Sequence, residues 1–284
     1  MGILKELRTP HISSHDIKHQ VGAPILEISN LTVRYENAVA LDDVSLQVTT
    51  AERLAVIGAN GAGKSTLFKV VAGVLQPSSG EVKIAGQKPG GHICIAYVPQ
   101  RTQVDWKFPV SVADVVMMGR IRKLGLLRWA QPRDWDYVSQ SLRVVGLQDL
   151  AGRQISELSG GQQQRMFIAR ALAQEAELML MDEPFTGLDV ASQEGILQIV
   201  IELQKRGVTV LASTHDLNLA SDHFDRVLLL NRRIFGLGPP QEVFTTDRLL
   251  RAFGGQLRLL QTETDVLALG DTCCEDETSH AHLA

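Results

Sequence analysis

Residues 58–66 of this chain have the types and the spacing of a phosphate-binding loop. Their sequence, GANGAGKST, fits G-x-x-x-x-G-K-[ST], between an apolar run and a helical one. Glycines let the backbone turn successive N–H groups toward an anion, and the following helix adds its positive dipole end. Lys64 would reach the β- and γ-phosphates, and Ser65 would place its hydroxyl on Mg²⁺. A glycine-rich turn with an incidental lysine is the alternative, and the strand–loop–helix context argues against it.

Two carboxylates follow a second apolar run. Residues 178–181 read as a buried strand, and Asp182 and Glu183 come directly after it. Adjacent side chains on a strand face opposite ways, so Asp182 would turn toward Mg²⁺ while Glu183 addresses a water molecule on the other side. A structural acidic pair is the other interpretation, which is disfavoured because the same sheet would carry the phosphate loop.

Three further polar residues are candidates for function only if they lie near the phosphate-binding loop and the two carboxylates. His215 follows the apolar run 208–214, at the strand edge where open α/β sheets bind ligands, although a lone histidine is usually structural. Gln100 follows another strand end. Ser159 has the type of a helix N-cap, and the two glycines after it are costly unless a backbone approaches a phosphate closely.

A parallel sheet would position these residues, and the chain has the elements for one. Continuous apolar runs are typical of buried parallel strands, whereas alternating runs are typical of half-buried antiparallel ones. The buried strands are predicted at 54–57, 93–98, 178–181 and 208–214, with helices over 66–72, 166–173 and 191–205. The alternating strands are predicted at 25–28, 31–35, 44–48 and 81–85, after a turn at 77–80. Two later strands, 224–230 and 234–235, and a helix over 242–253 complete the pattern.

A stretch of different character interrupts the sheet pattern. Residues 101–157 hold all three tryptophans and read as helices over 112–118 and 135–145, so we expect an inserted helical subdomain. Its aromatic side chains could form the core of that subdomain or anchor a protein interface. For Trp106 and Phe108 we favour the interface.

Length and composition exclude several classes of protein. The 284 residues fit one large domain or two small ones, and 44% hydrophobic residues suffice for a substantial core. A net charge of −4 gives no general electrostatic case for nucleic-acid binding. There is no run of 18 apolar residues and no apolar signal segment, so we expect no membrane crossing. Three cysteines do not make a disulfide framework, which favours a reducing cytosol.

Both ends of the chain carry groups that could bind a metal ion. Residues 1–23 read as a mobile arm with solvated histidines, and residues 254–284 as an extension that ends in an acidic tail. We favour these interpretations over metal sites, although thiolate and imidazole suit zinc and carboxylates suit manganese. The groups concerned are His11, His15, His19, Cys273, Cys274, His280 and His282.

In this combination and order, the motifs closely resemble those of the nucleotide-binding subunit of ABC transporters, over residues 24–253. They are the Walker A loop at 58–66, the Q-loop glutamine Gln100, the signature L-S-G-G-Q at 158–162, the Walker B end Asp182-Glu183, the D-loop residue Asp189 and the switch histidine His215. The resemblance implies an α/β fold: a P-loop NTPase (RecA-like) core with an N-terminal antiparallel β subdomain and an inserted helical subdomain at about 101–161.

By this resemblance, two copies of the chain meet head to tail with two ATP molecules between them, each bound by the loop of one copy and the signature of the other. Glu183 would be the general base, and His215 would hold the γ-phosphate and order the attacking water. Tyr35, on its own merely a strand aromatic, would stack on adenine. The implied catalytic residues are Glu183, His215, Lys64 and Gln100, and the implied Mg²⁺ ligands are Ser65, Gln100 and Asp182. The implied nucleotide-binding residues are Tyr35, Gly58, Asn60, Gly61, Gly63, Lys64, Ser65, Thr66, Ser159, Gly160, Gly161, Gln162 and Asp189.

The resemblance also implies partners and a location. We expect a separate membrane permease, docked beside Gln100 on the helical subdomain, an extracytoplasmic metal-binding protein, no nucleic acid, and a peripheral position on the cytoplasmic face of the inner (plasma) membrane. Residues 97–120 look like those of importers of manganese, zinc or chelated iron, so the expected function is ATP hydrolysis that energises uptake of a divalent metal. The alternatives are a siderophore or cobalamin importer, or a permease-free ABC ATPase such as an iron–sulfur assembly factor.

Overall fold

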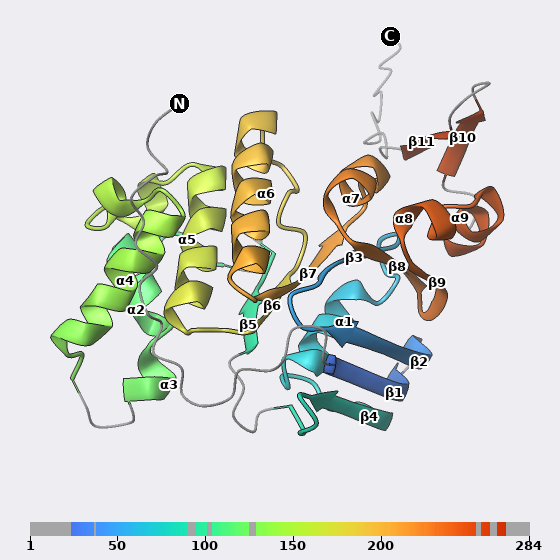
Figure 1. Cartoon of the computed structure of the whole chain (residues 1–284), viewed down its shortest axis with the longest axis horizontal. Helices are drawn as coiled ribbons and strands as arrows, with labels where there is room; N and C mark the ends of the chain where they lie inside the picture. The colour runs from blue at the N-terminus through green and yellow to red at the C-terminus, as the bar shows by residue number, and fades with distance from the viewer. Residues whose placement is uncertain are drawn as a thin grey trace, which may run out of the picture.

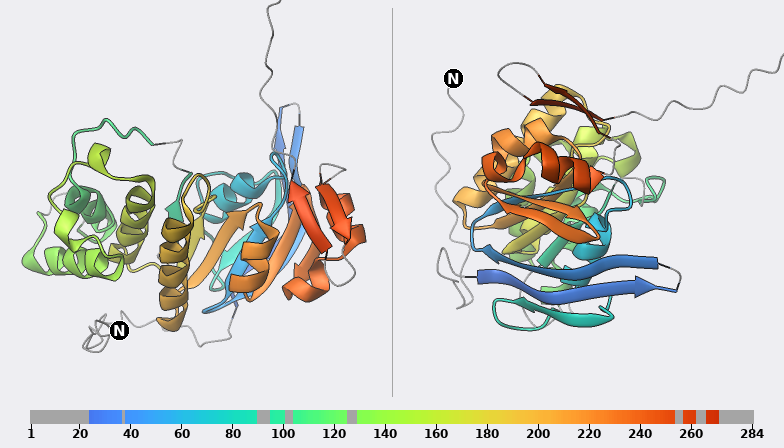
Figure 2. Two further views of the ribbon diagram at one scale, coloured as in Figure 1. Left: turned by 90° about the horizontal axis from the view of Figure 1, so that it is seen from above. Right: turned by 90° about the vertical axis from the view of Figure 1, so that its right-hand side faces the viewer.

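The computed structural model of the protein has three parts (Figure 1). A central sheet lies between a helical region, on the left of the view, and a three-stranded sheet at the lower right. The left panel of Figure 2 again shows the helical region standing apart from the strands. The structure describes residues 24–36, 38–89, 95–100, 104–124, 129–253, 257–261 and 266–270, the last two as backbone only. The histidines of the arm and the cysteines and histidines of the acidic tail lie outside these residues.

The central sheet has the strand order β5-β6-β7-β3-β8-β9. Neighbouring strands are parallel except β8 and β9, which pair antiparallel. All residues of β6 and β7 are buried, which explains the apolar sequence of β6 and of the middle of β7. The predicted parallel α/β core is therefore confirmed. The bounds are β3 (Arg53–Ile57), β5 (Ile95–Val98), β6 (Leu178–Met181), β7 (Thr209–Thr214), β8 (Arg226–Asn231) and β9 (Arg233–Gly238).

The second sheet is antiparallel, in the order β2-β1-β4, as its alternating sequences predict. Its strands are β1 (Pro24–Tyr35), β2 (Ala38–Thr49) and β4 (Ser79–Ile84). The segments expected at 25–28 and 31–35 form one continuous strand. The turn predicted before β4 is wrong in its second half, because the strand already begins at Ser79. Gly80 allows this: its φ is +90°, and a Cβ there would lie 2.4 Å from the carbonyl oxygen of Asn30.

Helices follow three strands of the central sheet, β3, β6 and β7. They are α1 (Lys64–Val71), α6 (Val190–Lys205) and α7 (Leu217–His223), followed at the end of the chain by α8 (Pro240–Val243), α9 (Thr246–Phe253) and a hairpin of β10 (Leu257–Gln261) and β11 (Val266–Gly270). The single helix predicted over 242–253 is wrong. Phe244 leaves the helical conformation, with ψ at +62°, so two short helices meet there. The β10–β11 hairpin was not among the predicted elements.

The helical region ends with α5, which leads back to the central sheet. Its elements are α2 (Val112–Met118), α3 (Ile121–Leu124), α4 (Pro132–Val144), two 3₁₀ turns (Gln148–Leu150 and Ile155–Glu157) and α5 (Gly160–Ala173). Gly119 ends α2, and a Cβ there would lie 2.2 Å from the carbonyl oxygen of Arg170, so the backbones of α2 and α5 are close. Because α5 continues past residue 161, the subdomain limits of about 101–161 stay a prediction.

A buried ion-pair network fixes α4 and α5 relative to each other. Arg120, 5% exposed, donates from Nε to Asp134 Oδ1 (3.2 Å) and from Nη1 to Glu175 Oε2 (2.7 Å). Nη1 also donates to the carbonyl oxygen of Ala173 (2.9 Å), and the guanidinium lies 4.0 Å from the centroid of the Tyr137 ring. Removing one partner of such a pair leaves a buried charge uncompensated, so the network holds these helices in one arrangement.

Trp106 does not have the surface position expected for it. Its ring meets that of Phe167 on α5 edge-on, with centroids 5.7 Å apart and an interplanar angle of 71°. The side chain is half-buried against the larger hydrophobic core. Phe108, in contrast, is 56% exposed. The pair therefore divides: Trp106 packs on the core, and only Phe108 is free for a surface role.

Trp106→Ala should consequently destabilise the isolated chain. Full burial of a tryptophan would make the loss 3–5 kcal/mol, so for half-burial we expect about 2 kcal/mol. That corresponds to a fall in melting temperature of roughly 4–8 °C for a chain of this size. Phe108→Ala is the matched control, and its melting temperature should stay within about 2 °C of the wild type. Thermal denaturation followed by circular dichroism measures both, and equal values for the two variants would contradict the packing role.

Candidate active site

The residues expected to do chemistry gather at one edge of the central sheet. The phosphate loop follows β3, Gln100 follows β5, Asp182 follows β6 and His215 follows β7. Since these strands are parallel and adjacent in the order β5-β6-β7-β3, their carboxyl ends lie side by side. The structure thus brings together groups that are far apart in the sequence, at the edge where open α/β sheets bind ligands.

The phosphate loop is built so tightly that its glycines are required. Gly63, with φ +99°, would place a Cβ 2.5 Å from the carbonyl oxygen of Ala40 on β2. A Cβ on Gly58 would lie 2.2 Å from the carbonyl oxygen of Leu230 on β8. Gly61 is also left-handed, with φ +80°, but has open space around it. The loop is therefore held from two sides by backbone, and the start of α1 lies where an anion could bind.

Lys64 lies folded over this loop. Its Nζ donates to the carbonyl oxygens of Gly58 (2.6 Å) and Ala59 (3.2 Å) and lies 3.9 Å from Glu183 Oε1. Burial lowers the pKa of Lys64, and the nearby carboxylates of Glu183 and Asp182 act in the opposite direction. A cation held between a phosphate loop and two carboxylates is suited to neutralise phosphate charge.

Asp182 and Glu183 both lie beyond the end of their strand, which stops at Met181. The expectation that strand alternation separates their side chains is therefore wrong. Glu183 instead has a left-handed backbone, with φ +47°, and this turn gives the two carboxylates different directions. Asp182 is 1% exposed. Its Oδ1 accepts a hydrogen bond from Ser213 Oγ (2.8 Å), and its Oδ2 accepts one from the hydroxyl of Tyr97 (3.3 Å).

The Glu183 carboxylate is also held by neighbours. Its Oε2 accepts hydrogen bonds from Gln100 Nε2 (3.1 Å) and from Thr186 Oγ1 (3.3 Å). Burial, with Asp182 beside it, raises the pKa of Tyr97, so its phenol stays a hydrogen-bond donor. Tyr97, Thr186 and Ser213 were not among the predicted site residues. A serine inside the otherwise apolar core of β7 was the one available signal for Ser213.

The remaining nucleotide-site candidates lie at element ends. Tyr35 is the last residue of β1 and is 50% exposed, so its ring face is open to stack on a base. His215 is exposed after β7. Asp189 caps α6 by accepting from the backbone N–H and the hydroxyl of Ser192, both at 2.9 Å, and these bonds lower the pKa of Asp189.

Ser159 is an N-cap, as its type predicts. It begins α5 with a capping box in which Gln162 Oε1 accepts from the Ser159 N–H (2.9 Å) and Ser159 Oγ accepts from the Gln162 N–H (3.4 Å). The packing within a single chain already explains why residue 161 is a glycine, because a Cβ there would lie 2.5 Å from Ser192 Oγ on α6. Close approach of two helices therefore requires this glycine whether or not a phosphate also comes near.

The donor set fits a magnesium nucleotide. The hydroxyl of Ser65, the amide oxygen of Gln100 and the carboxylate of Asp182 are oxygen ligands of the kind that Mg²⁺ prefers beside substrate phosphates. Asp182 is already oriented by two hydroxyl groups, as is usual for metal-binding carboxylates.

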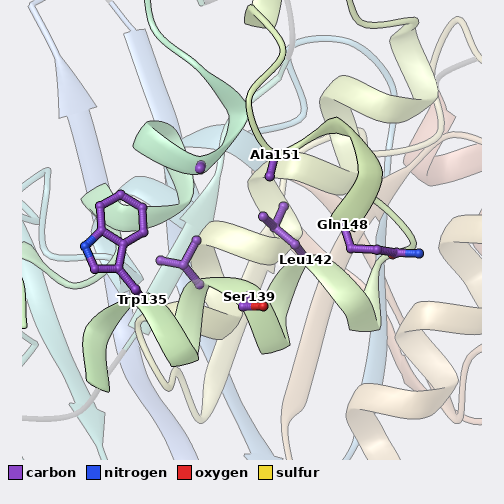
Figure 3. A pocket seen from close by; sticks show the side chains of 7 residues that line it. Trp135, Ser139, Leu142, Gln148 and Ala151 are labelled. Atoms are coloured by element: carbon purple, nitrogen blue, oxygen red, sulfur yellow. The ribbon is translucent and has the colours of Figure 1, made fainter. Parts of the chain in front are cut away.

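A groove of about 240 Å³ opens on the helical region (Figure 3). It lies between α4, the start of α2 and the first 3₁₀ turn, and its walls are mostly apolar. Trp135, at one end, is 44% exposed. The lining residues are Ala113, Trp135, Val138, Ser139, Leu142, Gln148 and Ala151. Elsewhere in the helical region, Trp129 is 93% exposed. Within the described residues, no helix combines the length and the apolar character needed to cross a membrane.

Comparison with known proteins gives a consistent family. The sequence profile of the ABC transporter family matches residues 41–186. The manganese transport system ATP-binding protein MntB of Bacillus subtilis is 46% identical over 86% of this chain and 98% of its own length. The zinc transport system ATP-binding protein TroB of Treponema pallidum is 43% identical, over 82% of this chain and 88% of its own. Among solved structures, the ATP-binding cassette MJ0796, a dimer in a post-hydrolysis state with ADP and Pi, superposes with a TM-score of 0.67 at 27% identity, over 76% of this chain and 98% of its own.

Proposed function

Because this chain belongs to the ABC transporter family, as an ATPase whose hydrolysis is coupled to transport, we propose that it energises uptake of manganese, zinc or iron through a separate membrane permease. The observation that supports a metal ion as the transported substrate is the similarity to the ATP-binding proteins of a manganese and a zinc transport system, over more than four-fifths of the chain. The metal assignment depends on this similarity to relatives and not on a binding site in this chain, because the transported ion would be bound by other subunits.

We assign the chemical steps to the residues at the sheet edge. Lys64, the loop N–H groups and the start of α1 bind the phosphates of ATP, and Tyr35 stacks on adenine. Ser65, Gln100 and Asp182 would hold Mg²⁺, which would supply positive charge to neutralise phosphate charge. Glu183 takes the proton of the attacking water, and His215 orders that water against the γ-phosphate.

The second half of the site comes from another copy of the chain in this proposal. The start of α5, with Ser159 and Gly161, lies in the helical region, whereas the phosphate loop follows β3 of the central sheet. The backbone N–H groups at the start of α5 are suited to bind a phosphate. A head-to-tail dimer supplies that phosphate from the partner's ATP. The dimeric structure of MJ0796 with ADP and Pi supports the dimer itself.

The permease would dock on the helical region. The groove between α2 and α4 is apolar with a half-exposed aromatic at its end, which suits a short apolar segment of a membrane protein. The Arg120 network joins α4, which lines this groove, to α5, which carries the signature. Docking there places the chain at the cytoplasmic face of the plasma membrane, with an extracytoplasmic metal-binding protein on the other side.

Metal uptake by cells that lack this chain tests the proposal. The cells are complemented with the wild type or with Lys64→Ala, and the initial uptake of Mn²⁺, Zn²⁺ and Fe²⁺ is measured by mass spectrometry of the cell contents. We expect the wild type, and not Lys64→Ala, to restore uptake of one of these ions, and the chain to sediment with membranes. Restored uptake of a ferric siderophore or of cobalamin alone would overturn the metal assignment. If the wild-type chain does not sediment with membranes, the proposal of a permease partner is overturned.

A further inference from the structure

We propose that Ser213 is a positioning residue for ATP hydrolysis, whose single hydroxyl sets both Asp182 and Glu183. The inference rests on the proposed roles of those two carboxylates. Ser213 lies on β7, two residues before His215, and is fully buried. It would not contact ATP in this role, and it acts through its two neighbours.

The hydrogen bonds of Ser213 have only one possible direction. Its Oγ lies 2.8 Å from the backbone nitrogen of Glu183 and 2.8 Å from Asp182 Oδ1. A backbone N–H can only donate, so the hydroxyl oxygen accepts from Glu183. The hydroxyl proton then goes to the Asp182 carboxylate, which can only accept while ionised. One side chain therefore fixes the carboxylate of one residue and the backbone of the next.

The bond to Glu183 holds a backbone that would otherwise be unfavourable. Glu183 has φ +47°, and the left-handed conformation is unfavourable for a residue with a Cβ. Glycine would avoid this cost but has no carboxylate. The bond from the Glu183 N–H offsets part of the cost and directs the side chain to Gln100 and Lys64. Sparsely populated backbone conformations of this kind cluster at active sites.

The pairing of the strands explains why this serine is in place. Met181 on β6 pairs with Ala212 on β7, so the residues that follow them, Asp182 just beyond the end of β6 and Ser213 on β7, are neighbours. On the other side, Ser213 pairs with Val56 of β3, an apolar residue. A buried hydroxyl is costly unless it is hydrogen-bonded, and both bonds that Ser213 makes here go to the two carboxylate residues.

The first test uses the nucleotide-free chain. Removing the hydroxyl in Ser213→Ala frees the Glu183 N–H, so hydrogen–deuterium exchange of that amide should speed up by about tenfold or more, the factor that corresponds to a lost bond of about 1.4 kcal/mol. Tyr97→Phe is the matched control, because it removes a hydroxyl from Asp182 alone and leaves the Glu183 amide bonded. Its exchange at Glu183 should equal that of the wild type. Unchanged exchange in Ser213→Ala would overturn the proposal.

The second test uses kinetics. Ser213→Ala should lower kcat by about tenfold or more at saturating Mg²⁺, because Glu183 is no longer held, with KM for ATP within about twofold. Ser213→Thr keeps a hydroxyl and should recover most of kcat, which covers the case that alanine impairs folding. An unchanged kcat in Ser213→Ala would also overturn the proposal, as would a loss of kcat in both variants together with a lower melting temperature.

A double variant separates this inference from the proposed function. At saturating Mg²⁺, which compensates for a weaker hold on Asp182, adding Ser213→Ala to Glu183→Gln should leave the residual rate of Glu183→Gln unchanged if Ser213 acts on catalysis through Glu183. A further fall of similar size in the double variant would make Ser213 a general stabiliser and overturn the inference. If Glu183→Gln itself hydrolyses ATP at the wild-type rate, the role of Glu183 fails first, whatever Ser213 does.

Discussion

Glu183→Gln should nearly stop ATP hydrolysis and leave ATP binding intact. The Glu183 carboxylate accepts from Gln100 and lies 3.9 Å from Lys64 Nζ, at the edge of the sheet that carries the phosphate loop. Glutamine keeps the size of the side chain but cannot take a proton from water. Because a positioned general base contributes roughly 10²–10⁴-fold to a rate, we expect turnover to fall by at least about 100-fold.

Phosphate release measures the turnover, and titration with a fluorescent ATP analogue measures binding. ATP that is bound but not cleaved should also hold two copies together, so size-exclusion chromatography with ATP should show a dimer of Glu183→Gln. Glu202→Gln is the matched control: it makes the same change on the outer surface of α6, where the carboxylate pairs with Arg206. It should turn over ATP normally. Near-normal turnover in Glu183→Gln would move the role of base to another residue.

The sheet that positions Glu183 was predictable because its signals are local. Each parallel strand is a short apolar run with a chemical residue at its end, and parallel strands end at one edge. The phosphate loop and the cap at Ser159 follow from residue types within a few positions of each other. These features needed no knowledge of which strands become neighbours.

The details of the active site depend on strand neighbours, which the sequence does not specify. Ser213 reaches Asp182 only because β7 lies beside β6 in one particular register. The left-handed backbone of Glu183 contradicts the expected strand geometry, since tertiary hydrogen bonds outweigh local preference there. The position of Trp106 also depends on a neighbour that the sequence does not specify. Its partner Phe167 lies on a helix distant in the sequence, and the expectation of a surface position did not include this contact.

Gly161→Asp should prevent ATP-driven dimerisation and hydrolysis, while each monomer still binds ATP. In the proposed head-to-tail dimer, the start of α5 faces the γ-phosphate bound by the partner. An aspartate there places a negative charge next to that phosphate, and the two repel each other. The structure adds a second effect. A Cβ at position 161 would lie 2.5 Å from Ser192 Oγ, so any side chain also pushes α5 away from α6.

Gly161→Ala separates charge from packing, because it adds the same Cβ without the carboxylate. Overpacking of this size costs about 1–3 kcal/mol, so we expect Gly161→Ala to weaken the dimer and Gly161→Asp to abolish it. Both changes are best made in Glu183→Gln and followed by size-exclusion chromatography with ATP, with ATP affinity measured on the monomers. If alanine is as severe as aspartate, contact with Ser192 rather than charge controls dimerisation. If the Gly161→Asp monomer no longer binds ATP, the signature serves the fold of its own copy, and the head-to-tail arrangement loses its support.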